Sequence, residues 1–89
     1  MTEAQRNLAV AYLDGRGIKR DLRKGNDWME RAALQGDPKA QYNLGLAHLE
    51  GEGRKQNKKM AKFWLSKAAG QGHVSARKLL RTVKARDLR

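Results

Sequence analysis

Residues 40–75 read AQYNLGLAHLEGEGRKQNKKMAKFWLSKAAGQGHVS, and residues 4–39 read AQRNLAVAYLDGRGIKRDLRKGNDWMERAALQGDPK. The two lines align without a gap at a period of 36 residues, and a third copy begins at Ala76. The positions that agree are mostly apolar residues and glycines, which recur as Ala4 and Ala40, Leu8 and Leu44, Gly15 and Gly51, Gly17 and Gly53, Trp28 and Trp64, and Ala32 and Ala68. A period of this length is typical of a repeat protein whose units stack into one continuous core.

Each copy has the pattern of two helices joined by a glycine-containing turn. In the second copy, Ala40, Leu44 and Ala47 recur at helical spacing and form one apolar face. Gly51 is expected to end that helix, because glycine supplies the left-handed backbone of a C-cap. A second helix follows, with Trp64 as its large apolar residue.

Polar residues mark the expected starts of the helices. Asp21 is an N-cap candidate in the first copy, and Asn57 stands at the same place in the second. Asp37 followed by Pro38 predicts another helix start, since proline suits the first helical position. Arg54 replaces the apolar residue of the first turn, which predicts a looser second turn.

The whole pattern predicts an all-α protein of five helices, arranged as two antiparallel helical hairpins and one closing helix. A single domain covers residues 1–89, with repeats at about 4–39 and 40–75 and a capping helix at about 74–87. No alternation of apolar and polar residues predicts a strand. Because the closing helix has no partner helix in the sequence, its basic residues are expected to keep its outer surface in water.

The chain of 89 residues is strongly basic, with 20 Lys and Arg against 9 Asp and Glu and a net charge of +11. This balance favours an anionic partner, which is a nucleic acid, an anionic membrane or an acidic protein. The absence of cysteine excludes disulfides and thiolate metal sites. No apolar run approaches the ~20 residues of a membrane span, and no signal peptide is recognised, so a cytoplasmic protein is expected; a trimmed form of an exported protein stays open as the alternative.

A known pattern covers nearly the whole chain. In the second copy it consists of Ala40-x-x-x-Leu44-Gly45-x-x-x-x-x-Gly51-x-Gly53, then Ala61-x-x-Trp64-x-x-Lys67-Ala68-Ala69-x-x-Gly72. This pattern resembles the Sel-one-like repeat (SLR) family, relatives of the tetratricopeptide repeats. The departures are local: Ala9 replaces the usual glycine of the family, Gly25 its usual alanine, and His48 its usual tyrosine.

The resemblance implies a right-handed α-solenoid of two full repeats and a C-terminal capping helix. Members of the family mostly act as adaptors or scaffolds in bacterial host interaction, envelope assembly, signalling and protein quality control. The resemblance does not imply an enzyme.

In solenoids of this family, the first helix of each repeat lines the concave side. At about 100° per residue, the face opposite the apolar one carries apolar centres with basic ends, together with Asp14 and Glu50. The expected partner-binding residues on this face are Arg6, Val10, Leu13, Lys39, Tyr42, Leu46, Leu49, Lys78 and Thr82. Such a groove suits a peptide or helix with acidic flanks. The alternative is that Leu13 and Leu49 pack on the second helix of their own repeat.

A second basic feature lies on the turns between the paired helices. Stacked repeats are expected to align these residues as a ridge, which comprises Lys19, Arg20, Arg23, Lys55, Lys58 and Lys59. One interpretation is a solvated face, and the other is docking of a nucleic acid or an acidic protein. Aromatic residues between the basic ones, which would favour nucleic acid, are not expected, because both Trp residues belong to the repeat core.

Catalytic and metal sites are not expected. The chain has two histidines, His48 and His73, and no spaced pair of carboxylates, so no catalytic residue, metal or cofactor is predicted. His48 stands at a packing position. Gly15-x-Gly17 follows a helix and not a strand, so it is not interpreted as a phosphate-binding loop.

The sequence therefore predicts a non-enzymatic adaptor, scaffold or inhibitor-like binder of another, acidic protein. Three alternatives remain. The chain could associate with nucleic acid through its basic surface, act as an immunity or anti-toxin protein that neutralises an acidic effector, or assemble with itself through the ends of the solenoid.

Overall fold

The computed structural model describes residues 2–51 and 55–87, and side chains as far as residue 84. Five α-helices make up this part of the chain, which contains no strand: α1 (Thr2–Asp14), α2 (Leu22–Leu34), α3 (Pro38–Glu50), α4 (Lys58–Gly70) and α5 (Val74–Asp87). The prediction of five helices and no strand is confirmed. The second turn, with Gly53 and Arg54, lies outside the described residues.

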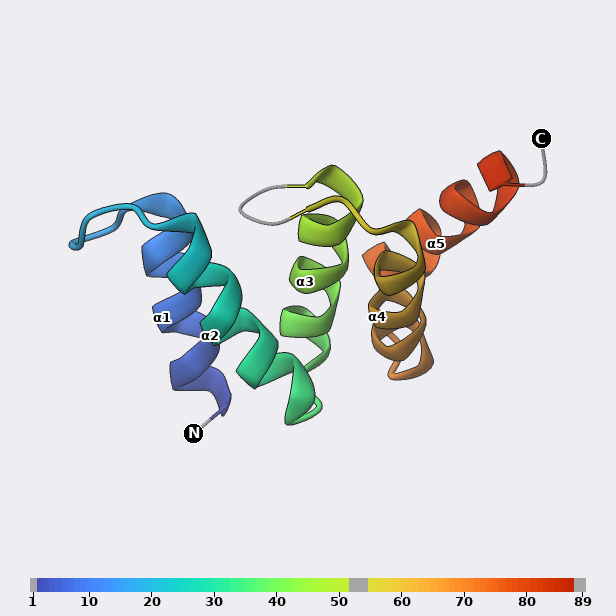
Figure 1. The fold of residues 1–89 in the computed structure, drawn as a ribbon. Coiled ribbons are helices and arrows are strands. Elements are labelled where there is room, and N and C mark those ends of the chain that lie inside the picture. Colours follow the sequence, from blue (N-terminus) through green and yellow to red (C-terminus); the bar gives the residue numbers. More distant parts are fainter. Residues whose placement is uncertain (1, 52–54, 88–89) are drawn as a thin grey trace.

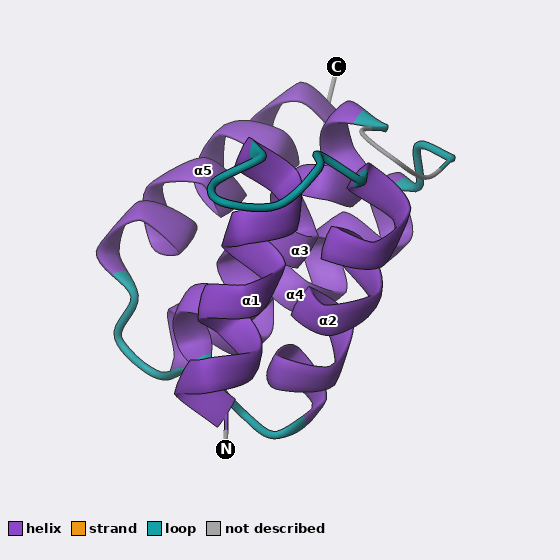
Figure 2. Ribbon diagram, turned by 90° about the vertical axis from the view of Figure 1, so that its left-hand side faces the viewer, coloured by secondary structure: helices purple, strands orange, loops and turns teal. Residues whose placement is uncertain are grey.

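Each helix packs on its neighbours in the chain, most extensively within the α1–α2 and α3–α4 hairpins. The result is an elongated α-solenoid of 42 × 24 × 17 Å, with the two termini at opposite ends (Figure 1). The α1–α2 and α3–α4 connections lie at one edge of the molecule, and the α2–α3 and α4–α5 connections lie at the opposite edge (Figure 2). Equivalent ends of α1 and α3, and of α2 and α4, therefore lie at the same edge.

Side chains cap the helices as predicted. The carboxylate of Asp21 accepts a hydrogen bond from the Lys24 backbone N–H at 3.0 Å, and Asp37 accepts one from Ala40 at 3.0 Å, with Pro38 as the first helical residue. Each such cap stabilises a helix by about 1 kcal/mol.

Two further caps complete the set. Asn57 Oδ1 accepts from the Met60 backbone N–H at 3.1 Å, at the start of α4. At the start of α5, the Nδ1 atom of His73 accepts from the Ala76 backbone N–H at 3.1 Å. The cap at His73 is not predicted from the sequence, because histidine is not a common N-cap residue.

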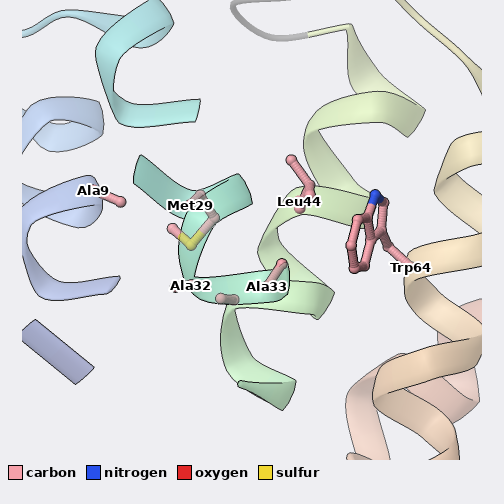
Figure 3. Close-up of a cluster of buried hydrophobic side chains, with 7 residues drawn as sticks. Ala9, Met29, Ala32, Ala33, Leu44 and Trp64 are labelled. Atoms are coloured by element: carbon pink, nitrogen blue, oxygen red, sulfur yellow. The ribbon is translucent and has the colours of Figure 1, made fainter. Parts of the chain in front are cut away.

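The core lies between the helices in two clusters. In the first, Leu44 and Met29 are fully buried and Trp64 extends from α4 toward them, while Ala32 and Ala33 let α2 approach closely (Figure 3). The second cluster contains residues of α4 and α5 and the partly buried residues packed on them, namely Leu65, Ala68, Ala76, Val83, Tyr42, Leu49, Ala69, Leu79 and Leu80. His48 is also buried, at 7% exposure, which confirms its packing role.

The apolar face predicted for the first helix of each repeat is covered only in the second repeat. Ala40 and Leu44 are fully buried because α2 packs on α3. At the equivalent positions of α1, Ala4 is exposed and Leu8 is half-buried, since among the described residues no helix precedes α1.

A pair of glutamines recurs in each hairpin. Gln35 Nε2 donates to Gln5 Oε1 at 2.8 Å, and Gln71 Nε2 donates to Gln41 Oε1 at 2.9 Å. Both pairs connect the start of the first helix of a repeat to the residue that follows its second helix. The repeat thus conserves within one chain a polar contact as well as its apolar positions.

Candidate binding surfaces on the two sides of the helix layer

A cleft of about 300 Å³ lies where α1 and α3 separate, and Asn26 of α2 contributes to it from between them. We call it the α1–α3 cleft, and its lining residues are Val10, Leu13, Asp14, Asn26, Asn43, Leu46, Ala47 and Glu50. Three of the expected partner-binding residues, Val10, Leu13 and Leu46, are among them. The cleft thus combines apolar side chains with amide and carboxylate groups.

The charged residues that line the α1–α3 cleft are Asp14 and Glu50, and both are exposed. They are the last residues of α1 and α3, where the backbone carbonyls give each helix a partial negative charge. Arg16 Nε lies 3.4 Å from Asp14, but this pair is largely exposed and adds little. These two carboxylates and the helix C-termini therefore contribute negative charge at this edge of the cleft.

Two of the expected groove residues make contacts within the fold. Arg6 Nη1 lies 2.9 Å from both carboxylate oxygens of Asp37, in an ion pair whose side chains are only 16% and 14% exposed. Tyr42 stacks on His73, with ring centroids 4.6 Å apart and an angle of 23° between the rings.

The leucines of the expected groove pack, as the alternative interpretation had it. Leu49 packs against the second core cluster. Leu13 packs against the first cluster and also lines the cleft. Lys39, Lys78 and Thr82 are exposed and do not line the cleft, and the Thr82 hydroxyl donates to the Lys78 carbonyl at 3.3 Å.

The six residues of the expected basic ridge are all exposed. They lie at the edge that holds the α1–α2 and α3–α4 connections (Figure 2), with Arg23 in the first turn of α2 and Lys58 and Lys59 in the first turn of α4. Neither first turn contains an acidic residue. Since helix N-termini carry partial positive charge, the start of α4 adds to the field of the basic side chains, whereas the start of α2 is capped by the carboxylate of Asp21.

An exposed aromatic residue interrupts the basic surface of α4, contrary to the sequence-based expectation. Trp64 belongs to the core, but Phe63 is 47% exposed and lies beside Lys59 and Lys67. A comparison of the two copies gives a signal for it, because the equivalent position holds Asp27. A residue that is charged in one copy and aromatic in the other has no fixed packing role.

Neither metal chemistry nor a membrane span is indicated in the described part of the chain. Residues 2–51 and 55–87 contain no group of three or more His, Cys, Asp or Glu side chains placed to hold a metal ion. Within the same residues, none of the helices is both long enough and apolar enough to cross a bilayer.

Comparison with known proteins identifies the repeats. The Sel1 repeat model matches residues 2–37 and 38–73, two consecutive units of the same length as the period found in the sequence. No curated protein matches the chain.

Three solved structures are similar over most of the chain. A Sel1 repeat protein from Oxalobacter formigenes is 40% identical, with a TM-score of 0.90 over 92% of this chain and 62% of that one. The protein c5321, a protective antigen of uropathogenic Escherichia coli with an SLR fold, is 38% identical, with a TM-score of 0.95 over 98% of this chain and 19% of that one. Cysteine-rich protein B of Helicobacter pylori is 29% identical, with a TM-score of 0.85 over 89% and 59%. This chain therefore spans less than two thirds of the length of each of these proteins.

Proposed function

Because the chain belongs to the Sel1 repeat family, whose members generally serve as protein–protein interaction modules and are typically non-catalytic, we propose that it is a protein-binding adaptor that takes a segment of its partner into the α1–α3 cleft. The observation that carries the proposal is the composition of that cleft. Val10, Leu13 and Leu46 offer an apolar surface, and Asn43 offers an amide beside it. Such a combination of apolar lining and a few polar groups is typical of a site for a peptide side chain.

The carboxylates favour one kind of partner segment. Asp14 and Glu50 lie at the negative ends of their helices, so a Lys or Arg side chain is the complement. The best ligand is an apolar residue followed closely by a basic one. An acidic partner, which the net charge favours, is repelled here and fits the basic surfaces of the molecule instead.

Titration of the isotopically labelled chain with short synthetic peptides tests the proposal by NMR. Peptides with an apolar residue beside Arg should shift the amide signals of Val10, Asn43 and Leu46, and peptides with Glu in place of Arg should not. Leu46→Ala should weaken binding about tenfold, through the loss of buried apolar area. The exposed carboxylate of Asp27 lies outside the cleft, so Asp27→Asn is the matched control for Asp14→Asn.

Two results would contradict the proposal. One is that Leu46→Ala and Asp14→Asn bind every peptide as the unchanged chain does. The other is that acidic peptides shift the cleft signals more than basic ones.

The basic ridge gives the nucleic-acid alternative its support. Six exposed cations at one edge, next to two helix N-termini, suit a phosphate backbone. That alternative predicts that an oligonucleotide binds, and that its affinity falls steeply with salt. An immunity or anti-toxin role is a special form of the adaptor proposal, in which the partner is an effector. A cytoplasmic location suits both the adaptor and the nucleic-acid proposals, and cell fractionation tests it.

A further inference from the structure

A second cleft, of about 390 Å³, lies between α2 and α4, the second helices of the two repeats. We call it the α2–α4 groove, and its lining residues are Glu30, Ala33, Leu34, Met60, Phe63, Trp64 and Lys67. None of them lines the α1–α3 cleft. Leu34 is 70% exposed and Phe63 is 47% exposed, the former at the end of α2 and the latter in the middle of α4.

The exposed apolar residues of this groove are not required by the repeat. Phe63 corresponds to Asp27, which is exposed on α2, so the fold accepts a carboxylate at this place. Leu34 corresponds to Gly70, so it is likewise not a fixed position of the repeat. Large exposed apolar side chains at positions without a packing role indicate a contact surface.

The charged side chains on the α4 side of the groove are all positive. The ionisable residues of α4 are all lysines, namely Lys58, Lys59, Lys62 and Lys67. Lys67 Nζ lies 5.3 Å from the centre of the Phe63 ring, and a shallow depression lined by Lys59, Lys62, Phe63, Ser66 and Lys67 continues the groove across α4. Glu30, on the α2 side, is the acidic residue of the lining. The partner must therefore be anionic on the side that faces α4.

We propose that the α2–α4 groove docks an acidic segment of a partner protein, whose apolar side chain enters between Leu34, Met60 and Phe63 while its carboxylates meet the lysines of α4. The observations favour protein over nucleic acid, because the lining includes the flexible apolar side chains of Leu34 and Met60 and offers one exposed ring. Single-stranded nucleic acid is held by successive stacked bases, which needs several aromatic platforms. This proposal concerns a separate surface, so it holds whether or not the α1–α3 cleft binds a partner.

Fluorescence anisotropy with the full chain tests it with defined probes. The main probe is a labelled peptide in which Glu alternates with Leu at helical spacing. One matched peptide has Gln for Glu, another has Ala for Leu, and a single-stranded oligonucleotide of equal charge is the fourth probe. The acidic, apolar peptide should bind best, and either replacement in the peptide should weaken it at least tenfold.

Phe63→Asp is the decisive variant, because it places in the second repeat the residue that the first repeat carries. The side chain is exposed, so the fold should persist, which circular dichroism checks. This variant and Lys67→Glu should each weaken the acidic peptide at least tenfold. Ser75→Asp makes the same change of charge as Phe63→Asp at an exposed position of α5 outside the groove, so it should change the affinity less than twofold, and so should Leu46→Ala in the α1–α3 cleft.

Three outcomes would overturn the proposal. The first is unchanged affinity for the acidic peptide in Phe63→Asp. The second is an oligonucleotide that binds more tightly than the peptide and loses its affinity in the same variant. The third is self-association in sedimentation experiments that Phe63→Asp abolishes, because the groove is then covered by a second copy of the chain.

Discussion

At the scale of single residues, a glycine of one helix lies close to an alanine of the other in each hairpin, and the two residues have exchanged places between the hairpins. A Cβ atom on Gly25 would lie 2.6 Å from Leu13 Cδ2 and 3.1 Å from the Ala9 carbonyl oxygen. A Cβ atom on Gly45 would lie 2.8 Å from Leu65 Cγ and 3.4 Å from the Ala61 carbonyl oxygen. Since Ala9 corresponds to Gly45 and Gly25 to Ala61, the two departures from the family pattern in the first repeat compensate each other.

The first prediction concerns Gly25. In Gly25→Ala the new methyl group collides with Leu13, so the free energy of unfolding should fall by about 1–3 kcal/mol, although alanine is the better helix former. Urea denaturation followed by circular dichroism measures the change. The double variant Ala9→Gly with Gly25→Ala reproduces the arrangement of the second hairpin, so its loss should be smaller than the sum of the single losses. If the loss of unfolding free energy in the double variant equals the sum of the two single losses, the two residues do not compensate each other.

The second prediction concerns Asp37, which has two roles. Its carboxylate caps α3 at Ala40 and pairs with Arg6, whose side chain is only 16% exposed. Asp37→Ala removes the cap and leaves a half-buried guanidinium without its partner, so we expect a loss of about 2–3 kcal/mol. Asp37→Asn keeps a capping oxygen and should lose less. If thermal unfolding shows equal losses for both variants, the cap contributes nothing, and if Asp37→Asn loses no stability, the ion pair contributes nothing.

At the scale of helices, several charged side chains stand at helix ends whose partial charge has the same sign. Asp14 and Glu50 stand at negative C-terminal ends, while Lys58 and Lys59 stand at the positive start of α4. Each of these placements lowers the stability of its helix and strengthens the field outside it. This pattern is expected of surfaces that are kept for binding and not for stability.

The third prediction follows from this conflict at α4. Lys58→Glu and Lys59→Glu replace repulsion at the helix start with attraction, so each should stabilise the chain by about 0.3–1 kcal/mol at low salt. Both should also weaken the acidic peptide. Calorimetric unfolding temperatures and the anisotropy titration give the two results. A variant that becomes less stable would contradict the dipole argument, and added salt should reduce the gain.

The helices could be predicted from the sequence, and the binding surfaces only in part. Caps such as Asp37 with Pro38 depend on residues a few positions apart, so the local pattern is sufficient. Helical periodicity alone predicts that Arg6 and Tyr42 lie in the groove, but their contacts, Asp37 and His73, are 31 residues further along the chain. Periodicity gives the face of a helix, whereas the pairing across that face depends on how successive hairpins are turned against each other.

At the scale of the whole molecule, the two clefts lie on different pairs of helices and carry different charge. The α1–α3 cleft is lined by carboxylates, and the α2–α4 groove lies beside the lysines of α4. Under the two proposals, this chain of net charge +11 binds a basic segment and an acidic one at separate places. An adaptor that works in this way would hold two partners together without contact between them.

The last prediction is that the two sites are occupied independently. The clefts share no lining residue, and the fully buried Met29 and Leu44 belong to the core of the helix layer that holds both. Mobile ions screen exposed charges at physiological salt over a Debye length of about 8–10 Å, which weakens the interaction between the charges of the two ligands. Saturating the chain with the basic peptide should therefore change the dissociation constant of the acidic peptide less than about threefold, which corresponds to a coupling free energy below about 0.7 kcal/mol.

Calorimetric titration of the acidic peptide with and without the basic one measures this coupling, and Phe63→Asp and Leu46→Ala provide the controls for each site. Competition between the two peptides would mean that they occupy one surface, and the adaptor would then bind a single partner at a time.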